Sequence, residues 1–475
     1  MSVAGSDSTS SATPRSEEFR TVVAAGLPRA IADISGLVRI PSVSWDGFDH
    51  SHVQASADRV AELARELGVF ESVEVVQLPV SDPDSDALGL PAVVATREAK
   101  AGKPTILLYA HHDVQPPGDD AAWDSKPFEP TVRGERLYGR GAADDKAGVA
   151  LHLAAIRAHL EVLGDPEIGL VLYAEGEEEF GSRSILTFLD HYRETFDADV
   201  IVVADSGNWT TEIPAITVGL RGAVAFNLRI TTLDHASHSG MFGGPVPDAM
   251  LAAIRTLDTL WNPDGSVAVE GLDSREAETP DYDEAQLRLE TGLLPEVAPI
   301  GRGEIVSRMW NQPAITITGI DAPSVREASN TLVPSVRVRV SARVAPGQRA
   351  EDAYAAIMAH LERNAAYGAR LEVDGLDLGQ PFLVDTSGWA VADAREVLEE
   401  AFGAPAVEMG VGGSIPFIAE LAERFPRAQI LVTGVEDPDS RAHSPNESLH
   451  IPSLERAILA EALLLSRLGA RTPAS

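Results

Sequence analysis

The chain has 475 residues, 44% hydrophobic and 23% charged, which is too long for one ordinary core and predicts two or three domains. It contains no Cys, so disulfides, thiolate metal ligands and cysteine nucleophiles are excluded, and any metal must be bound by His, Asp and Glu. The formal net charge of −34 repels phosphate backbones, and we therefore expect no nucleic-acid partner.

The N-terminal region is rich in Ser, Thr and Asp and has no hydrophobic signal core. No apolar stretch reaches the roughly 20 residues that cross a bilayer, so we expect a cytoplasmic protein without a membrane partner. Residues 1–16 are expected to be disordered, and residues 17–42 to form a helix that runs into a loop.

From Val73 to Asp205, apolar runs typical of buried strands alternate with segments of helical periodicity, which indicates α/β layering. We predict strands near 73–78, 105–110, 169–174 and 199–204, and helices near 145–163 and 181–192.

After Pro214 the pattern changes to α+β with antiparallel strands. We predict strands at 218–232, 314–320, 332–343 and 370–374, and helices at 246–261 and 349–366. From about Ser387 helix and strand alternate again, with a strand at 430–432 and a last helix at 453–468. The predicted fold is thus an α/β catalytic domain with a mixed, mainly parallel sheet flanked by helices (1–213 and 382–475), interrupted by an inserted α+β domain (214–381).

Five short acidic or His-containing islands are candidate metal ligands. They are His111-His112-Asp113, Asp144-Asp145, Glu178-Glu179, Asp205 and His443. Four of them are predicted just past the carboxyl ends of strands, where open α/β sheets build their sites. His111 and Asp113, at i and i+2, project from the same face of an extended segment.

Divalent ions such as zinc accept His nitrogen and carboxylate oxygen, and two of them can share a bridging carboxylate and one hydroxide. Three carboxylates and two His carry −3 against +4, and the hydroxide neutralises the site. Taken alone, each island is more often a helix cap, a turn or solvated surface. All five in this order favour a two-metal hydrolytic site.

Four motifs resemble those of the carnosinase, aminoacylase and glutamate carboxypeptidase family of dinuclear zinc peptidases, over nearly the whole chain and closest to its dipeptidase branch. They are Ala110-His111-His112-Asp113-Val114-Gln115-Pro116, Gly139-Arg140-Gly141-Ala142-Ala143-Asp144-Asp145-Lys146, Glu175-Gly176-Glu177-Glu178-Glu179-Phe180-Gly181-Ser182 and Ala442-His443-Ser444-Pro445-Asn446-Glu447.

The resemblance implies a role for each matching residue. His111 and Asp205 would bind one metal, Glu179 and His443 the other, and Asp144 would bridge them. Asp113 would orient the His111 imidazole. Glu178 would be the general base and acid that serves the attacking water and the leaving amine. The family also implies a cis peptide between Asp144 and Asp145.

For substrate binding, the resemblance implies that the inserted domain is a lid and dimerisation domain. In Ala236-Ser237-His238-Ser239-Gly240, His238 would reach the active site of the partner subunit and stabilise the oxyanion, which requires a homodimer. Arg343 and the Gly412-Gly413-Ser414-Ile415-Pro416 loop would bind the substrate carboxylate, through Gly413 and Ser414 in the loop. Asn330 and Thr331 are weaker candidates for the same pocket.

The predicted reaction is therefore hydrolysis of dipeptides or short peptides with two divalent ions, zinc first and manganese or cobalt as alternatives. An N-acyl-amino-acid deacylase is the main alternative on the same site. A catalytically silent binding protein is a third reading, and the complete set of ligands together with Glu178 argues against it.

Overall fold

The structure, a computed structural model, describes residues 14–471 except 83, 277–278 and 412–415. The predictions for Gly413 and Ser414 and for disorder in residues 1–13 lie outside these residues. Residues 14–16 were predicted to be disordered, which is wrong, because the first helix already begins at Pro14. The chain divides into two compact units. Unit 1 comprises Met1–Thr217, Asp385–Glu408 and Glu420–Ser475, and unit 2 comprises Val218–Val384 and Met409–Ala419.

The core of unit 1 is a six-stranded sheet in the order β1-β2-β6-β3-β7-β17. The strands are β1 (Ser72–Val76), β2 (Ala92–Arg97), β6 (Gly169–Glu175), β3 (Thr105–His111), β7 (Val200–Val203) and β17 (Gln429–Val432). The four strands from β6 to β17 are parallel, whereas β2 pairs antiparallel with both of its neighbours, β6 and β1. The mixed, mainly parallel sheet is therefore confirmed. Its central strands are buried almost throughout, as the continuous apolar runs predict.

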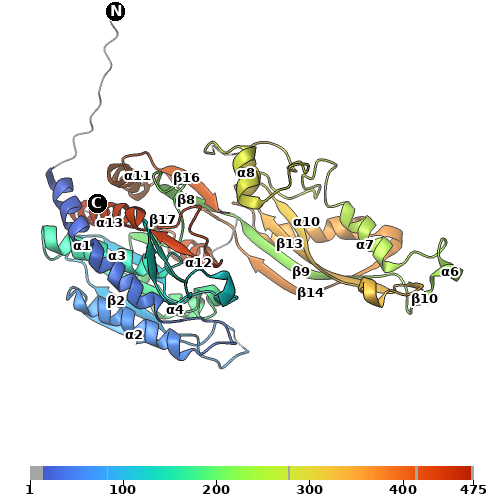
Figure 1. The fold of residues 1–475 in the computed structure, drawn as a ribbon, viewed down its shortest axis with the longest axis horizontal. Helices are drawn as coiled ribbons and strands as arrows, with labels where there is room; N and C mark the ends of the chain where they lie inside the picture. Colours follow the sequence, from blue (N-terminus) through green and yellow to red (C-terminus); the bar gives the residue numbers. More distant parts are fainter. Residues whose placement is uncertain (1–13, 83, 277–278, 412–415, 472–475) are drawn as a thin grey trace, which may run out of the picture. The chain divides into compact units, whose positions relative to one another are not determined.

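The larger helices of unit 1 are α1 (Pro14–Val38), α2 (Ser51–Glu66), α3 (Lys146–Leu163), α11 (Trp389–Phe402) and α13 (Ile451–Ala470). The shorter ones are α4 (Ile185–His191), α5 (Arg193–Phe196) and α12 (Pro416–Arg424), with single turns η1 (Asp120–Ala122) and η2 (Glu178–Phe180). Figure 1 shows α1 and α3 side by side, and the two helices are in contact. The helix predicted at 181–192 is present as the shorter α4, which begins at Ile185 after a loop, and α5 follows it from Arg193.

By length and apolar content alone, Arg15–Val38 within α1 could cross a membrane, contrary to the sequence expectation. It is the one such segment among the residues that the structure describes, and core helices of soluble proteins pass the same test. Phe19, Ile34 and Leu37 have no exposed surface, and the helix packs against α3 and α13. One face of α1 is therefore packed within unit 1, although only 33% of the apolar window is buried.

The chain also forms two smaller sheets. One has the order β18-β5-β4, built from Ser448–His450, Arg136–Tyr138 and Thr131–Arg133. The other has the order β15-β8-β16, built from Phe382–Leu383, Ala215–Leu220 and Val407–Val411. The strand predicted at 218–232 is in fact two strands in different sheets, β8 and β9 (Gly222–Thr231), separated at Arg221.

Unit 2 is an antiparallel sheet in the order β11-β13-β9-β14 with helices on one face, as Figure 1 shows for α7 and α10. Its strands are β11 (Ala314–Asp321), β13 (Ser335–Val344), β9 and β14 (Arg370–Gly379), and its helices include α7 (Ala249–Asp258) and α10 (Ala350–Arg363). Alternate residues of β9 and β13 are buried against these helices. The remaining elements are β10 (Ser237–His238), α6 (Ser239–Phe242), α8 (Glu284–Thr291), α9 (Ile305–Trp310), η3 (Val325–Glu327), β12 (Thr331–Leu332) and η4 (Ala366–Gly368).

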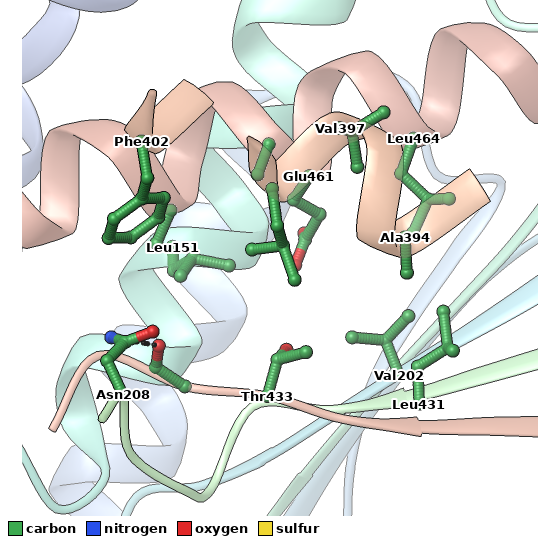
Figure 2. Close-up of a pocket in the computed structure, with 14 residues that line it drawn as sticks. Leu151, Val202, Asn208, Ala394, Val397, Phe402, Leu431, Thr433, Glu461 and Leu464 are labelled. Carbon is green, nitrogen blue, oxygen red and sulfur yellow. Dashed lines mark hydrogen bonds between the residues drawn. The ribbon is translucent and has the colours of Figure 1, made fainter. Parts of the chain in front are cut away.

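A small cavity of about 30 Å³ lies in unit 1 between the β7–β17 edge of the sheet and helices α11 and α13 (Figure 2). Aliphatic side chains form most of its wall, and Asn208 donates a hydrogen bond to the carbonyl of Gly434 (3.2 Å). The carboxylate of Glu461, on the same wall, is held by His152 at 2.9 Å. This volume holds a water molecule and excludes a dipeptide, so the cavity is a packing feature.

Candidate metal centre

The carboxyl end of β3 carries the first pair of site residues. His111 is the last residue of the strand, and its Nδ1 lies 3.3 Å from Oδ1 of Asp113. The Asp113 carboxylate also accepts the backbone N–H of Glu178 (3.2 Å) and of Glu179 (3.1 Å). Since Asp113 has no exposed surface, one carboxylate fixes both the imidazole and the turn that carries the two glutamates.

Asp144 lies between two histidines. Its Oδ1 is 3.0 Å from Nε2 of His111, and its Oδ2 is 3.0 Å from Nε2 of His443. The peptide bond between Asp144 and Asp145 is cis, as the family resemblance implies. The two oxygens of one carboxylate thus face two different imidazoles, which is the arrangement that a carboxylate bridging two ions requires.

Two triads of ligand atoms share Asp144. His111, Asp144 and Asp205 form one, and Asp144, Glu179 and His443 form the other, with the ligand atoms of each triad all within 4.8 Å of one another. Each triad offers one imidazole nitrogen and two carboxylates, the donors that zinc and similar ions accept. The residues therefore fit two divalent cations.

Charge is concentrated at this centre. Hydrogen bonds to Asp144 and Glu179 raise the pKa of His443 to about 11. Burial lowers the pKa of His111, but hydrogen bonds to Asp113 and Asp144 outweigh burial and raise it well above its usual range. Burial would raise the pKa of Asp144, but hydrogen bonds from the two histidines hold it well below its usual range. The carboxylates of the site therefore favour positive charge at its centre.

Glu178 lies beside the triads without belonging to either one. Its side chain is 17% exposed, and its Oε2 is 4.0 Å from Nε2 of His111. Burial and the charge of Asp205 raise the pKa of Glu178 well above its usual range. A partly exposed carboxyl whose pKa is raised suits proton transfer.

Glu447 is a central residue of this site that the sequence reasoning missed. Its buried carboxylate accepts Nη1 of Arg140 (2.6 Å) and the backbone N–H groups of Gly141 (3.1 Å), Ala143 (3.0 Å) and Asp144 (3.2 Å). Glu447 thus holds the loop that presents Asp144. The Asn446-Glu447 pair after His443 was part of the recognised motif, so its proximity to a ligand was the available signal.

Gln115 and Lys146 were also missed. Gln115 donates from its backbone N–H (3.2 Å) and from Nε2 (2.6 Å) to the Glu179 carboxylate. Lys146 is fully buried, and its Nζ donates to the carbonyl of Leu37 in the last turn of α1 (2.8 Å) and to that of Ile40 just beyond the helix (2.7 Å). Burial lowers the pKa of Lys146 to about 7. Gln115 thus positions the carboxylate of Glu179, and Lys146 connects the segment after Asp144 to the end of α1.

One site prediction needs correction. The second island, Asp144-Asp145, follows β5, which belongs to the small β18-β5-β4 sheet and not to the central parallel sheet. His111 ends β3, and Glu178 and Asp205 follow β6 and β7, so these three islands lie at the carboxyl edge of the central sheet as predicted. The Asp144 loop reaches this edge through its contacts with Glu447 and the histidines.

Within unit 2, three predicted substrate residues lie together. His238 in β10 pairs with Thr331 in β12, and the N–H of Ser239 donates to the carbonyl of Asn330 (2.9 Å). Nδ1 of His238 accepts the N–H of Gly240 at 3.0 Å, so in the neutral ring the proton is on Nε2. His238 therefore presents an exposed hydrogen-bond donor.

Arg343 lies in β13, opposite Ala223 of β9 and Ala314 of β11. Burial and the nearby positive charge of Arg343 lower the pKa of Arg221 to about 10. Among the residues that the structure describes, no carboxylate forms an ion pair with either guanidinium. Two neighbouring cations without a counter-ion are suited to an anionic group.

A mixed α/β sheet with two carboxylate–histidine triads that share one aspartate defines a metal-dependent hydrolase of the two-metal type. The model of peptidase family M20/M25/M40 matches residues 107–467. The chain belongs to this family, which confirms the resemblance inferred from the motifs.

The relatives are dipeptidases by name. The chain is 34% identical over 424 residues to the cysteinylglycine-S-conjugate dipeptidase of Corynebacterium striatum, covering 88% of this chain and 90% of that protein. It is 25% identical over 409 residues to the Beta-Ala-His dipeptidase of Rattus norvegicus, covering 82% of each.

Solved structures share the fold over nearly the full length. The dipeptidase Dug1p from Saccharomyces cerevisiae superposes with a TM-score of 0.77 at 22% identity, covering 96% of this chain and 99% of that chain. Human carnosine dipeptidase 1 superposes with a TM-score of 0.75 at 22% identity, covering 97% and 100%.

Proposed function

We propose that this chain is a dinuclear metallodipeptidase that hydrolyses the peptide bond of unblocked dipeptides or short peptides. The observation that carries the proposal is the Asp144 carboxylate, whose two oxygens face the imidazoles of His111 and His443 in two triads. His111 and Asp205 would bind one ion, Glu179 and His443 the other, and Asp144 both. The dipeptidase names of the relatives support the substrate class.

When bound, two divalent ions supply Lewis acidity and activate water for attack on the scissile carbonyl. Glu178 would accept a proton from the attacking water and deliver it to the leaving amine, because its carboxyl is partly exposed at the centre and its pKa is raised. Asp113 keeps the His111 ring and the Glu178–Glu179 turn in place throughout. We propose zinc as the ion, with manganese or cobalt able to replace it.

His238 would donate a hydrogen bond to the developing oxyanion in the active site of the partner subunit, so the enzyme would be a homodimer. Its Nδ1 is occupied by the N–H of Gly240, which leaves Nε2–H free to donate. The following residues, Met241 and Phe242, are 72% and 47% exposed. Neighbouring exposed apolar side chains of this kind are typical of a surface that another protein surface covers.

Arg343 would bind the substrate carboxylate, since it lacks an anionic partner among the described residues and lies near a second guanidinium. Gly413 and Ser414 would add N–H donors to the same carboxylate. Asn330 and Thr331 would line the pocket beside His238, to which they are joined by backbone pairing. We propose a cytoplasmic location, consistent with the burial of α1 against α3 and α13.

The test is amide hydrolysis by the zinc-loaded protein on free dipeptides and on N-acetylated amino acids. We expect cleavage of the dipeptides and its loss in Glu178→Ala, with two metals per chain still present by elemental analysis. The matched control is Glu129→Ala, which removes an exposed carboxylate and should leave the rate unchanged. Preference for the acetylated compounds would instead identify a deacylase, and metal loss in Glu178→Ala would show that Glu178 is a ligand.

A further inference from the structure

Glu436 is a carboxylate at the metal centre that the proposed mechanism does not use. It follows β17, the strand that pairs in parallel with β7, and its backbone continues this pairing past the end of the sheet. The N–H of Asn208 donates to the Glu436 carbonyl at 2.8 Å, and Gly207 is its bridge partner. Glu436 is thereby fixed beside the segment that immediately follows Asp205.

Glu436 interacts electrostatically with the metal ligands, since the backbone pairing places it beside Gly207, two residues after Asp205. Its burial and the negative charges of Asp144 and Asp205 raise its pKa well above the usual range, and His443 opposes that rise. The carboxylate belongs to neither triad of ligand atoms. Glu436 is therefore a carboxyl group beside the centre that the two triads do not use.

Apart from Glu178, the general base proposed above, the other non-ligand carboxylates near the centre already have donors. Each is buried and accepts hydrogen bonds from backbone N–H groups, a hydroxyl or an arginine; they are Asp113, Asp145, Glu175, Glu177 and Glu447. Within the described ranges, Glu436 has no side-chain hydrogen bond or ion pair, and it is partly exposed. It is an acceptor that a ligand can reach.

The substrate class supplies the matching donor. In an unblocked dipeptide the α-amino nitrogen is two bonds from the scissile carbonyl carbon, about 2.5 Å away. Wherever that carbonyl binds at the triads, the amino group must lie within the same few ångströms. A cation there needs a carboxylate that is not consumed by metal binding, because an unpaired charge is costly in a partly buried site.

We propose that Glu436 binds the free α-ammonium group of the dipeptide and so selects unblocked dipeptides over N-acylated amino acids. The inference rests on the dipeptidase function proposed above. Glu436 would thus determine specificity, since an acyl group at this position offers no positive charge and leaves the carboxylate without a partner.

The test compares two ligands that differ only in the amino group, alanylglycine and propionylglycine. Binding is measured by calorimetry to zinc-loaded full-length Glu178→Ala, which should not turn over, with and without Glu436→Gln. We expect Glu436→Gln to weaken alanylglycine by about 10- to 100-fold and to leave propionylglycine within about twofold, as for loss of one charge-assisted hydrogen bond. Asp439→Asn, an exposed carboxylate in the same loop, is the control and should change neither affinity.

The outcomes separate the two proposals. Equal weakening of both ligands, an unchanged preference for alanylglycine, or loss of zinc in Glu436→Gln would each overturn the role of Glu436 while leaving the dipeptidase proposal standing. If the parent protein binds propionylglycine at least as tightly as alanylglycine, or binds neither, the dipeptidase proposal itself fails and the role of Glu436 falls with it.

Discussion

Replacing Glu447 by Ala removes the acceptor that holds the Asp144 loop. The buried Arg140 guanidinium, 1% exposed, loses its carboxylate at 2.6 Å, and the N–H groups of Gly141, Ala143 and Asp144 lose theirs. Breaking a buried ion pair by removing one partner costs about 3 to 5 kcal/mol. Each N–H left without an acceptor adds about 1 to 3 kcal/mol unless water enters the space left by the side chain.

The ion pair alone therefore predicts a loss of at least about 3 kcal/mol in the free energy of unfolding, a large part of the roughly 5 to 15 kcal/mol typical of a domain. Urea unfolding of the metal-free protein, followed by far-UV circular dichroism, measures this loss. Metal affinity should fall as well, because the N–H of Asp144 is one of the groups released.

Two comparisons make the result decisive. Glu447→Gln keeps the side-chain volume and one acceptor oxygen, so it should lose less stability than the alanine variant. Glu129→Ala breaks the exposed Lys126–Glu129 pair and should have no measurable effect. A loss below about 1 kcal/mol in Glu447→Ala, with unchanged zinc affinity, would refute the reasoning that this carboxylate organises the loop.

Three further predictions concern dimerisation, metal binding and pH. His238→Ala should lower turnover in a protein that remains dimeric by light scattering; full activity would contradict the cross-subunit role. Zinc binding should release protons and tighten as pH rises from 6 to 9, since the pKa of His443 is raised to about 11 in the metal-free site, and pH-dependent calorimetry measures both. Burial lowers the pKa of His152, but the charge of Glu461 outweighs burial and raises it. The stability that this pair contributes is therefore complete below about pH 6.5 and is lost as pH rises through the raised pKa. His152→Leu should remove that part of the pH dependence of urea unfolding, and identical slopes would contradict it.

Much of the site could be predicted from local sequence pattern and residue spacing. The apolar run before His111 predicted the buried strand β3, and the i, i+2 spacing predicted that His111 and Asp113 share a face, as their 3.3 Å contact shows. The order of the five islands led to the family. These features were predictable because strand periodicity and a ligand motif are each encoded within a few consecutive residues.

Other features depended on contacts between distant segments. Glu447 meets Asp144 across 303 residues, and Glu436 comes to lie beside Gly207 only because β17 adds to the sheet next to β7. The break at Arg221 between β8 and β9 could not be predicted from the sequence, because an apolar run does not show which sheet each of its parts joins.

The sequence by itself determined the α/β class, the metal-binding residue types, the cis peptide through its family motif and the family itself. Only the tertiary structure decided that Asp144 lies between His111 and His443, that Glu447 holds its loop, and that Glu436 remains without a partner among the described residues. The physical reason is that residue chemistry is fixed locally, whereas which donors satisfy a buried carboxylate depends on segments that meet only when the chain has folded.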